Sequence, residues 1–355
     1  MKIIIAPDSF KGSARAEEIC DILAKKISTE VPDAEIIKMP LGDGGEGTAE
    51  VFALVYPETE RKEVLITDLF GRRKAVYYFM HGKNAYIETA QAVGLDKTNL
   101  DVMSSSSIGV GQMILDACKN GAERIFLGLG GSGTCDAGIG ALSALGFSFY
   151  KSGKRKIFPC GAVLKDMTEI FGEMDEIVKS CVFTAVSDVQ NPLFGKNGAA
   201  FVYAPQKGAD RTDVEILDKG LYNFAVISGH FNVAFVPGSG AAGGLGFFAA
   251  AFLGAEIISG IDFVLDMYNY DNIPADLVIT GEGCIDSQTL YGKAVSGILR
   301  RARGRRVLAL CGKKGIGCEK LGCDVVSINP PGEPEEISVK NVFKNLSGFD
   351  IKKYL

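Results

Sequence analysis

The chain has 355 residues and a formal net charge of −5 at pH 7. A chain of this length exceeds the size at which one hydrophobic core usually keeps growing, so two domains are expected. The acidic balance, without a long basic run, argues against nucleic acid as the main partner.

Cysteine usage and the apolar stretches predict a cytoplasmic protein. The 9 cysteines lack paired C-x-x-C spacing, which is typical of free thiols in a reducing compartment. The apolar run before Asp8 is too short for a signal peptide. Residues 220–255 contain no Asp, Glu, Lys or Arg, but Pro237 and many glycines interrupt them. We therefore expect a strand, a glycine loop and a buried helix at 241–253 there, and no membrane partner.

The chain begins with a strand–helix–strand pattern. Residues 2–6 form a short apolar run, a helical spacing of apolar residues follows at 19–27, and 34–39 return as a strand. Ligands of open α/β sheets bind beyond the carboxyl ends of the strands. Polar residues of two loops are expected there: Asp8, Ser9, Lys11, Asp43 and Glu46. The alternative is that Asp8, Asp43 and Ser13 only cap helices.

The pattern changes at Val64, where alternating runs up to about Thr89 predict antiparallel strands. A helix at 107–118, a strand at 182–187 and the uncharged stretch would share this second domain. Strand, helix and strand then return at 275–280, near 290–303 and at 306–311. The tail beyond Pro330 is polar and proline-interrupted, and we assign it no element.

The expected fold class is α/β with two domains. A Rossmann-like domain with a parallel sheet would comprise residues 1–62 and 270–355. A second α/β domain with some antiparallel strands would be inserted at 63–269.

Three glycine-rich turns lie along the chain. The first lies within residues 124–140, which we interpret as a strand, a tight loop and the start of a helix, and the others are at 238–246 and 281–289. Glycine lets the backbone adopt positive φ and approach a ligand, while Ser132, Thr134 and the next helix offer donors to an anion. Such turns also serve packing alone. Their repetition favours one polyanionic ligand held from several sides.

Carboxylates and lysines must carry the chemistry. The only histidines, His81 and His230, make neither a histidine-rich metal site nor a Ser-His-Asp triad easy to build. Acidic residues at strand ends suit Mg²⁺, which binds one or two carboxylates plus phosphate oxygens. Lysines would neutralise phosphate charge, as phosphoryl transfer requires. The sequence G-x-x-x-x-G-K-[ST] is absent, so this would not be a P-loop enzyme.

Two other functions remain open from the residues alone. Residues 128–133 fit G-x-G-x-x-G, which suggests a dehydrogenase. No acidic residue lies between Asp136 and Asp166 to bind a ribose, although Lys151 and Lys154 offer a site for an NADP phosphate. The other alternative is a non-enzymatic sensor of small acids, which would need neither clustered carboxylates nor three glycine loops.

Seven motifs occur in order along residues 1–315: A-P-D-S-F-K-G at 6–12, G-D-G-G-E-G at 42–47, G-G-S at 130–132, S-D-V-Q-N-P-L at 187–193, P-Q-K-G-A at 205–209, G-A-A-G-G-L-G at 240–246 and G-E-G-C-I-D-S-Q-T-L-Y-G-K at 281–293. This set resembles the bacterial type I glycerate kinases. The resemblance implies ATP-dependent phosphorylation of D-glycerate, usually at the 2-hydroxyl to give 2-phosphoglycerate, with 3-phosphoglycerate as the other product. It also implies a two-domain α/β fold with the active site between domains.

The chain departs from the family pattern at three places. Cys284 stands where we expect arginine, residues 131–136 read G-S-G-T-C-D where the family often has G-S-A-T-N-D, and the part after Gly315 is idiosyncratic. The first departure would weaken a contact to an acidic substrate or to ATP.

Roles within the motifs are our own assignment. The predicted catalytic residues are Asp188, as the base for the glycerate hydroxyl, and Lys11 and Lys293, which with Ser9 would bind carboxylate or phosphate. The predicted Mg²⁺ ligands are Asp43, Glu282 and Asp286. The predicted substrate or phosphate contacts are Asp8, Ser9, Gly130, Gly131, Ser132, Gly243, Gly244 and Lys207. The predicted small molecules are D-glycerate, ATP and Mg²⁺; no oligomeric state is predicted.

Overall fold

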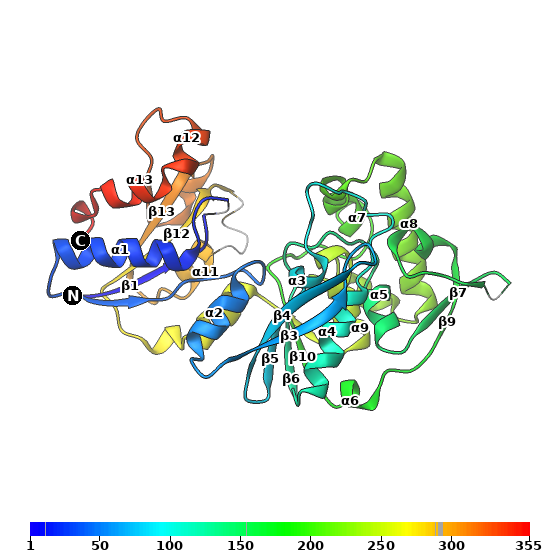
Figure 1. Cartoon of the computed structure of the whole chain (residues 1–355). Coiled ribbons are helices and arrows are strands. Elements are labelled where there is room, and N and C mark those ends of the chain that lie inside the picture. The colour runs from blue at the N-terminus through cyan, green and yellow to red at the C-terminus, as the bar shows by residue number, and fades with distance from the viewer. Residues whose placement is uncertain (11, 154, 288, 290–293) are drawn as a thin grey trace. The chain divides into compact units, whose positions relative to one another are not determined.

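The computed structural model describes residues 1–10, 12–153, 155–287, 289 and 294–355 (Figure 1). The chain divides into two compact units, which we call the discontinuous unit (Met1–Asp43 with Ser259–Leu355) and the inserted unit (Gly44–Ile258). Both chain ends, marked N and C in Figure 1, belong to the discontinuous unit. Among the described residues, no helix is long and apolar enough to cross a membrane.

The discontinuous unit contains a five-stranded parallel sheet in the order β14-β13-β12-β1-β2. Its elements in chain order are β1 (Lys2–Pro7), α1 (Ala16–Glu30), β2 (Glu35–Lys38), α10 (Gly260–Met267), η5 (Tyr270–Asn272), β12 (Leu277–Ile285), α11 (Ala294–Arg300), β13 (Arg306–Lys314), η7 (Cys318–Leu321), β14 (Asp324–Ser327), α12 (Glu335–Lys340), α13 (Val342–Gly348) and η8 (Ile351–Lys353). The predicted return of the C-terminal strands to the first sheet is confirmed, since β1 lies between β12 and β2.

The apolar pattern explains these elements. The interior strand β1, between β12 and β2, is buried from Ile3 onward, as expected for a parallel strand covered on both faces. In α1, Ile19, Leu23 and Ile27 recur at helical spacing and are buried against the sheet. The carboxylate of Glu18 accepts the N–H of Arg15 and so satisfies a donor at the start of α1.

The inserted unit contains a six-stranded mixed sheet, β11-β10-β6-β5-β4-β3, and a three-stranded sheet, β8-β7-β9. Its elements are α2 (Thr48–Val55), β3 (Glu60–Thr67), β4 (Arg73–His81), β5 (Asn84–Glu88), α3 (Ala90–Val93), α4 (Ile108–Lys119), β6 (Arg124–Gly128), α5 (Ile139–Ala144), β7 (Ser148–Lys151), β8 (Arg155–Lys156), η1 (Gly161–Asp166), β9 (Met167–Phe171), α6 (Glu176–Lys179), β10 (Val182–Val186), α7 (Ala199–Tyr203), η2 (Pro205–Lys207), α8 (Arg211–Ile227), η3 (Phe231–Phe235), η4 (Ala241–Gly243), α9 (Leu245–Phe252) and β11 (Glu256–Ile258).

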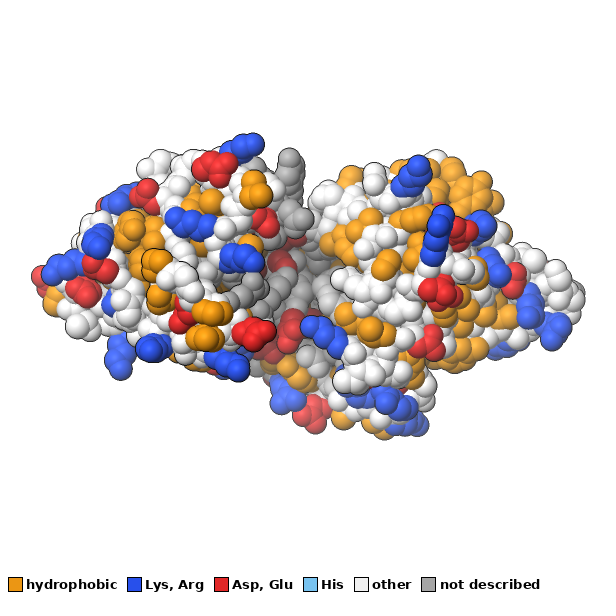
Figure 2. All heavy atoms as spheres, turned by 90° about the horizontal axis from the view of Figure 1, so that it is seen from above, with side chains coloured by type: hydrophobic (Ala, Val, Ile, Leu, Met, Phe, Trp, Pro, Cys, Tyr) orange, Lys and Arg blue, Asp and Glu red, His pale blue; other side chains and the backbone are white. Residues whose placement is uncertain are grey.

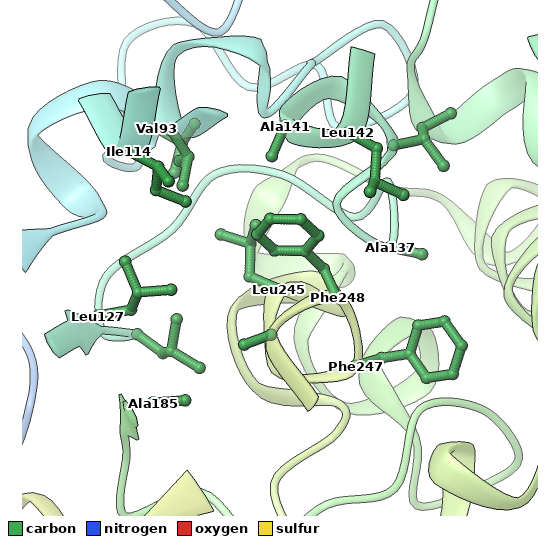
Figure 3. Close-up of a cluster of buried hydrophobic side chains, with 14 of the residues drawn as sticks. Val93, Ile114, Leu127, Ala137, Ala141, Leu142, Ala185, Leu245, Phe247 and Phe248 are labelled. Carbon is green, nitrogen blue, oxygen red and sulfur yellow. The ribbon is translucent and has the colours of Figure 1, made fainter. Parts of the chain in front are cut away.

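Strands β3, β4 and β5 pair antiparallel, as the alternating runs predict, whereas β5, β6, β10 and β11 are parallel. The expected α/β fold class, with a parallel sheet and a second unit that has antiparallel strands, is therefore confirmed. Figure 3 shows the core of this unit, where Leu127 of β6 and Ala185 of β10 lie near Leu245 and Phe248 of α9.

The boundaries between units differ from those set by sequence at 62/63 and 269/270. Residues 44–62 fall in the inserted unit, because α2 packs on β4 and β5. Residues 259–269 fall in the discontinuous unit, because α10 packs on α11.

Three expectations about elements need correction. Residues 281–285 continue β12 and pair with β13, so Glu282 lies in a strand and the third glycine-rich turn is shorter than predicted. The predicted buried helix at 241–253 is broken after η4, where Gly244 has a φ of 96°. The tail is ordered into α12 and α13, since Val342 and Leu346 are four residues apart and bury one face against the core that includes α1.

Acidic and basic side chains are mixed over the face shown in Figure 2, in agreement with the balanced composition of the chain.

Candidate active site

The site in the inserted unit begins where three parallel strands end. Strand register places Glu88 of β5 beside Gly128 of β6, and Gly128 beside Val186 of β10. The loops that follow these strands therefore leave from one edge of the sheet, the edge at which α/β proteins bind ligands. Loop 129–138, which lies within the predicted glycine-rich stretch 124–140, and loop 187–193 start here.

Glycines in these loops permit close packing of backbone on backbone. A Cβ on Gly130 would lie 2.2 Å from the Cα of Gly45, and a Cβ on Gly243 would lie 1.9 Å from the carbonyl oxygen of Thr134. A Cβ on Gly244 would lie 2.7 Å from the Cα of Ala137. At these three positions, close packing against neighbouring backbone is sufficient to explain why the residue is glycine.

Gly131 differs from the other glycines of the site. It is exposed, its φ is +70°, and a Cβ there would meet only the Cβ of Ala90, at 3.6 Å. Backbone conformation, and not crowding by protein atoms, therefore requires glycine at this position. Among the predicted glycines, Gly131 is the one beside which the loop leaves open space.

Lys207, at the end of η2, places a buried amino group against loop 129–138. Its side chain is buried, with 3% of the residue exposed, and Nζ donates to Ser132 Oγ at 3.1 Å and to the carbonyl oxygen of Thr134 at 2.8 Å. Both acceptors are uncharged, and no carboxylate of the described residues forms an ion pair with it. Burial lowers the pKa of Lys207 to about 8. The nearby carboxylate of Asp136 acts on this pKa in the opposite direction. A buried ammonium group without an ion-pair partner favours the binding of an anion.

Thr134 adds a second unsatisfied group beside Lys207. Its side chain is fully buried, and Oγ1 has no hydrogen-bond partner among the described residues. A buried hydroxyl without a partner costs free energy unless a ligand or water supplies one. The structure thus brings together Ser132, Thr134 and Lys207, three of the residues that the sequence singled out.

Asp136 holds loop 129–138 in place, a role that sequence reasoning missed. Its carboxylate is fully buried and accepts from the N–H and hydroxyl of Ser107, both at 2.8 Å, and from the N–H of Gly138 and Gly140 at 3.0 and 3.2 Å. Burial raises the pKa of Asp136, and these hydrogen bonds act in the opposite direction. The feature of the sequence that indicates this role is an acidic residue directly after the glycine-rich turn, in S-G-T-C-D at 132–136.

Asp188 lies two residues after the end of β10 and is partly buried. The backbone before it is fixed, since Ser187 donates its N–H to Ile258 at 2.9 Å and accepts the N–H of Val189 on Oγ at 3.2 Å. The loop is joined to the second glycine turn by the N–H of Gly240, which donates to Asn191 at 2.9 Å. Asp188 therefore stands at the same sheet edge as loop 129–138.

The discontinuous unit gathers carboxylates at its own sheet edge. Asp8 follows β1, and its N–H donates to the carbonyl oxygen of Gly281 on the neighbouring strand, at 2.9 Å. Asp8 and Glu282 are both nearly buried, with 8% and 6% exposed. Glu282 Oε1 accepts from the hydroxyl of Thr289 at 2.6 Å, and Thr289 Oγ1 in turn accepts the N–H of Asp286 at 3.2 Å. Asp8, Glu282 and Asp286 thus share one edge.

The other predicted residues of this unit are Ser9, Asp43, Lys11 and Lys293. Ser9 is partly buried and donates its N–H to Asp8 Oδ1 at 2.6 Å. Asp43 is partly buried in the loop after β2. Lys11 and Lys293 lie outside the described residues.

No group of three or more His, Cys, Asp or Glu side chains that could hold a metal ion occurs in the described part of the chain. Mg²⁺ commonly takes only one or two protein carboxylates and completes its shell with water and phosphate oxygens. The described carboxylates at the edge of the discontinuous unit fit such a sparse ligand set. The predicted metal ligands stay a prediction.

A surface hollow of about 460 Å³ lies elsewhere on the inserted unit. It is lined by Lys151, Ser152, Lys165, Asp166, Met167, Thr168 and Asn223. None of the predicted site residues borders this hollow, so it is no part of the candidate site.

Comparison with known proteins identifies relatives over nearly the whole chain. Residues 3–347 match the model of the glycerate kinase family. The chain is 41% identical over 315 residues to a glycerate kinase of Bacillus cereus, covering 85% of this chain and 82% of the relative. It is 39% identical over 314 residues to glycerate 2-kinase of Escherichia coli, with the same coverage of 85% and 82%.

A solved structure is similar in fold as well as in sequence. The crystal structure of a protein from Salmonella typhimurium LT2, provisionally assigned as glycerate kinase 2, matches with a TM-score of 0.82 and 35% identity. The match covers 98% of this chain and 95% of that protein.

Proposed function

The chain belongs to the glycerate kinase family, and we propose that it transfers a phosphoryl group from ATP to the 2-hydroxyl of D-glycerate, giving 2-phosphoglycerate. The family makes it an enzyme that phosphorylates glycerate. The choice of the 2-hydroxyl is supported by the name of the Escherichia coli relative, glycerate 2-kinase. The motif set along residues 1–315 supports assignment to type I of the family.

One observation carries the proposal within the structure: Lys207 is a buried cation held by uncharged oxygens at a sheet edge rich in glycine loops. Both substrates of the proposed reaction are anionic. The γ-phosphate of ATP or the carboxylate of glycerate would supply the negatively charged partner that Lys207 lacks among the described residues. The Thr134 hydroxyl and the exposed backbone at Gly131 would add donors to the same anion.

We assign the proton transfer to Asp188. A kinase of small hydroxy acids needs a carboxylate that orients the substrate hydroxyl and accepts its proton as the phosphoryl group arrives. Asp188 is ionisable, partly exposed and carried by the rigid end of β10, which suits that task. Ser9, Lys11 and Lys293 are assigned to the carboxylate or phosphate groups. Asp8, Gly130, Ser132, Gly243 and Gly244 are assigned to shaping the substrate and phosphate contacts.

For Mg²⁺ we propose the ligands Asp43, Glu282 and Asp286, which would bind directly or through water. When bound, the ion would neutralise charge on the phosphates of ATP. Asp8 beside Glu282 would keep that edge negative and favourable for a cation.

The test is a substrate panel. Purified protein is incubated with Mg²⁺, ATP and, separately, D-glycerate, tartronate and lactate, while ADP release is followed and the phosphorylated product is identified by NMR. We expect ADP release with D-glycerate and a phosphorus signal coupled to the proton on carbon 2. A product with phosphate on carbon 3 would overturn the regiochemistry and leave the kinase reaction intact.

The same panel includes NADPH with a hydroxypyruvate-like acid. Oxidation of NADPH in the absence of any phosphorylated glycerate would overturn the kinase proposal in favour of the dehydrogenase that the G-x-G-x-x-G pattern suggests.

A further inference from the structure

Glu88 is a buried acid that none of the assigned roles uses. It is the last residue of β5, its exposed fraction is 3%, and its register partner on β6 is Gly128. It lies one strand away from the start of loop 129–138. In the sequence it is the lone charged residue of an otherwise buried strand.

The glycine-rich turn Gly44–Gly47 packs on the same strand ends. A Cβ on Gly128 would lie 2.8 Å from the carbonyl oxygen of Gly44, and one on Gly130 would lie 2.2 Å from the Cα of Gly45. The N–H of Gly130 donates to the carbonyl oxygen of Gly44 at 3.2 Å. The turn thus supports the loop that carries Ser132 and Thr134.

The carboxyl group of Glu88 meets the end of this turn. The backbone N–H groups of Gly47 and Ala49, at the start of α2, donate hydrogen bonds to it. Its Oε2 atom is buried and has no hydrogen-bond partner among the described residues. The charged groups near it are acidic: Glu46 before α2 and Glu50 on α2. The phenol of Tyr77 on β4 also faces it.

These surroundings favour a neutral carboxyl group. Burial raises the pKa of Glu88 to about 8, and Glu50 and Glu46 add to that rise, while the two amides act in the opposite direction. A charged Glu88 would leave a buried, unpartnered oxygen beside two other carboxylates, and only the entry of water would relieve it. Movement of the turn away from the strand ends would admit such water.

We propose that Glu88 is a positioning residue for the turn Gly44–Gly47, and that it holds the turn as a neutral carboxylic acid. Loss of the proton would loosen the turn and, with it, the support of loop 129–138. The consequence for activity rests on the proposed kinase reaction. The consequences for protonation and stability do not, so the two can fail separately.

The protonation state is tested by infrared spectroscopy of the full-length protein. We expect the carbonyl stretch of a protonated carboxylic acid at pH 7, which is absent from Glu88→Gln and disappears from the wild type near pH 8. Glu50→Gln is the matched control. It removes one of the like charges and leaves Glu88 in place, so the titration should move to lower pH. Absence of the band from wild type at pH 7 would overturn the proposal, whether or not Glu88→Gln folds.

Thermal unfolding gives a second readout. The folded-state pKa lies above the ordinary value of 4.5, so Glu88 lowers stability progressively as pH rises from about 4.5 to 8. The melting temperature of Glu88→Gln should therefore exceed that of wild type by a margin that grows from pH 5 to pH 8. A margin that is constant over this range contradicts the proposal.

Activity separates positioning from mere packing. Glutamine reproduces the neutral acid and its acceptor oxygen, so Glu88→Gln should keep kcat/KM for glycerate within about twofold at pH 7. Glu88→Ala removes the acceptor for both amides, and kcat/KM should fall by about tenfold or more. Equal losses in the two variants would show that a neutral side chain does not suffice.

Discussion

The Nζ atom of Lys207 lies 2.8 Å from the carbonyl oxygen of Thr134, a residue 73 positions earlier in the chain. This hydrogen bond joins η2 to the glycine loop after β6 and holds the ammonium group against that loop. Both of its described acceptors are uncharged, so the ammonium group has hydrogen bonds but no ion-pair partner among the described residues. The carboxylate of Asp136 acts on it only from nearby. Burial of this ammonium group lowers the stability of the folded protein, and a bound anion would offset that loss.

Substitutions of Lys207 should distinguish the contribution of its charge to activity from that of its side-chain volume. Lys207→Met keeps most of the volume but no charge, and we expect kcat/KM to fall by about 10²-fold or more. In the wild type, activity should decline above pH 8 as Lys207 loses its proton. Lys207→Arg should move this decline to higher pH, because arginine stays charged. An unchanged alkaline limb in Lys207→Arg would assign it to another group.

Anion binding should also change the pH dependence of stability. The folded-state pKa of about 8 lies below the ordinary value of 10.5, so the cost of the buried charge is fully present below pH 8 and disappears as pH rises toward 10.5. That cost is about 3 kcal/mol from the size of the shift. A bound anion should therefore raise the melting temperature more at pH 7 than at pH 9.5. Lys207→Met, measured in parallel, should lose this difference.

The sequence predicted the elements better than the contacts of the site. Helical spacing at Ile19, Leu23 and Ile27 predicts α1, and the apolar run at the start of the chain predicts the buried strand β1. Glu282 was predicted in a turn because glycines flank it, yet β12 continues there beside β13. At Gly281 a Cβ would lie 2.2 Å from the carbonyl oxygen of Leu310. Glycine marked the close approach of two strands, which sequence alone does not distinguish from a turn.

The candidate site was predicted as a set of strand-end residues and not as a network. Strand order brings Ser132 and Asp188 to one edge, and this followed from their place after parallel strands. The bond from Lys207 to Ser132 joins residues 75 positions apart, and no local pattern encodes it. Glu88 is a single acidic residue in an apolar strand, a pattern that indicates a special role for the acid but does not identify its contacts.

Asp188→Asn tests the assigned base. Asparagine keeps the size and a hydrogen-bonding oxygen but loses the charge and most of the basicity. General-base help is typically worth about 10² to 10⁴ in rate, so kcat should fall by that range. The melting temperature and ATP affinity should barely change, because the turn after β10 needs only an acceptor. Near-full kcat would move the role of base to Asp286 or Asp43, and an unfolded variant would make Asp188 structural.

Metal dependence tests the carboxylate edge of the discontinuous unit. We expect EDTA to abolish phosphorylation and Mg²⁺ to restore it. Glu282→Gln keeps an oxygen for the Thr289 hydroxyl but loses the charge, so the Mg²⁺ concentration for half-maximal activity should rise by about tenfold or more. The control is Asp324→Asn at the start of β14, where the acid forms an exposed ion pair with Arg306 and no other ion pair with the described residues. If both variants respond equally to Mg²⁺, Glu282 is not a ligand.

Two glycine variants distinguish ligand approach from packing in the loop after β6. In Gly243→Ala the new Cβ would lie 1.9 Å from the Thr134 carbonyl oxygen, so the loops must separate and the protein should lose several kcal/mol of stability. Gly131→Ala meets no such crowding, and its positive φ should cost only about 1 to 2 kcal/mol. Gly131→Ala should therefore fold with a melting temperature close to wild type while KM for ATP or glycerate rises, because the methyl group occupies the open side of the loop. Wild-type KM values for both substrates in Gly131→Ala would mean that no ligand approaches the backbone at this position.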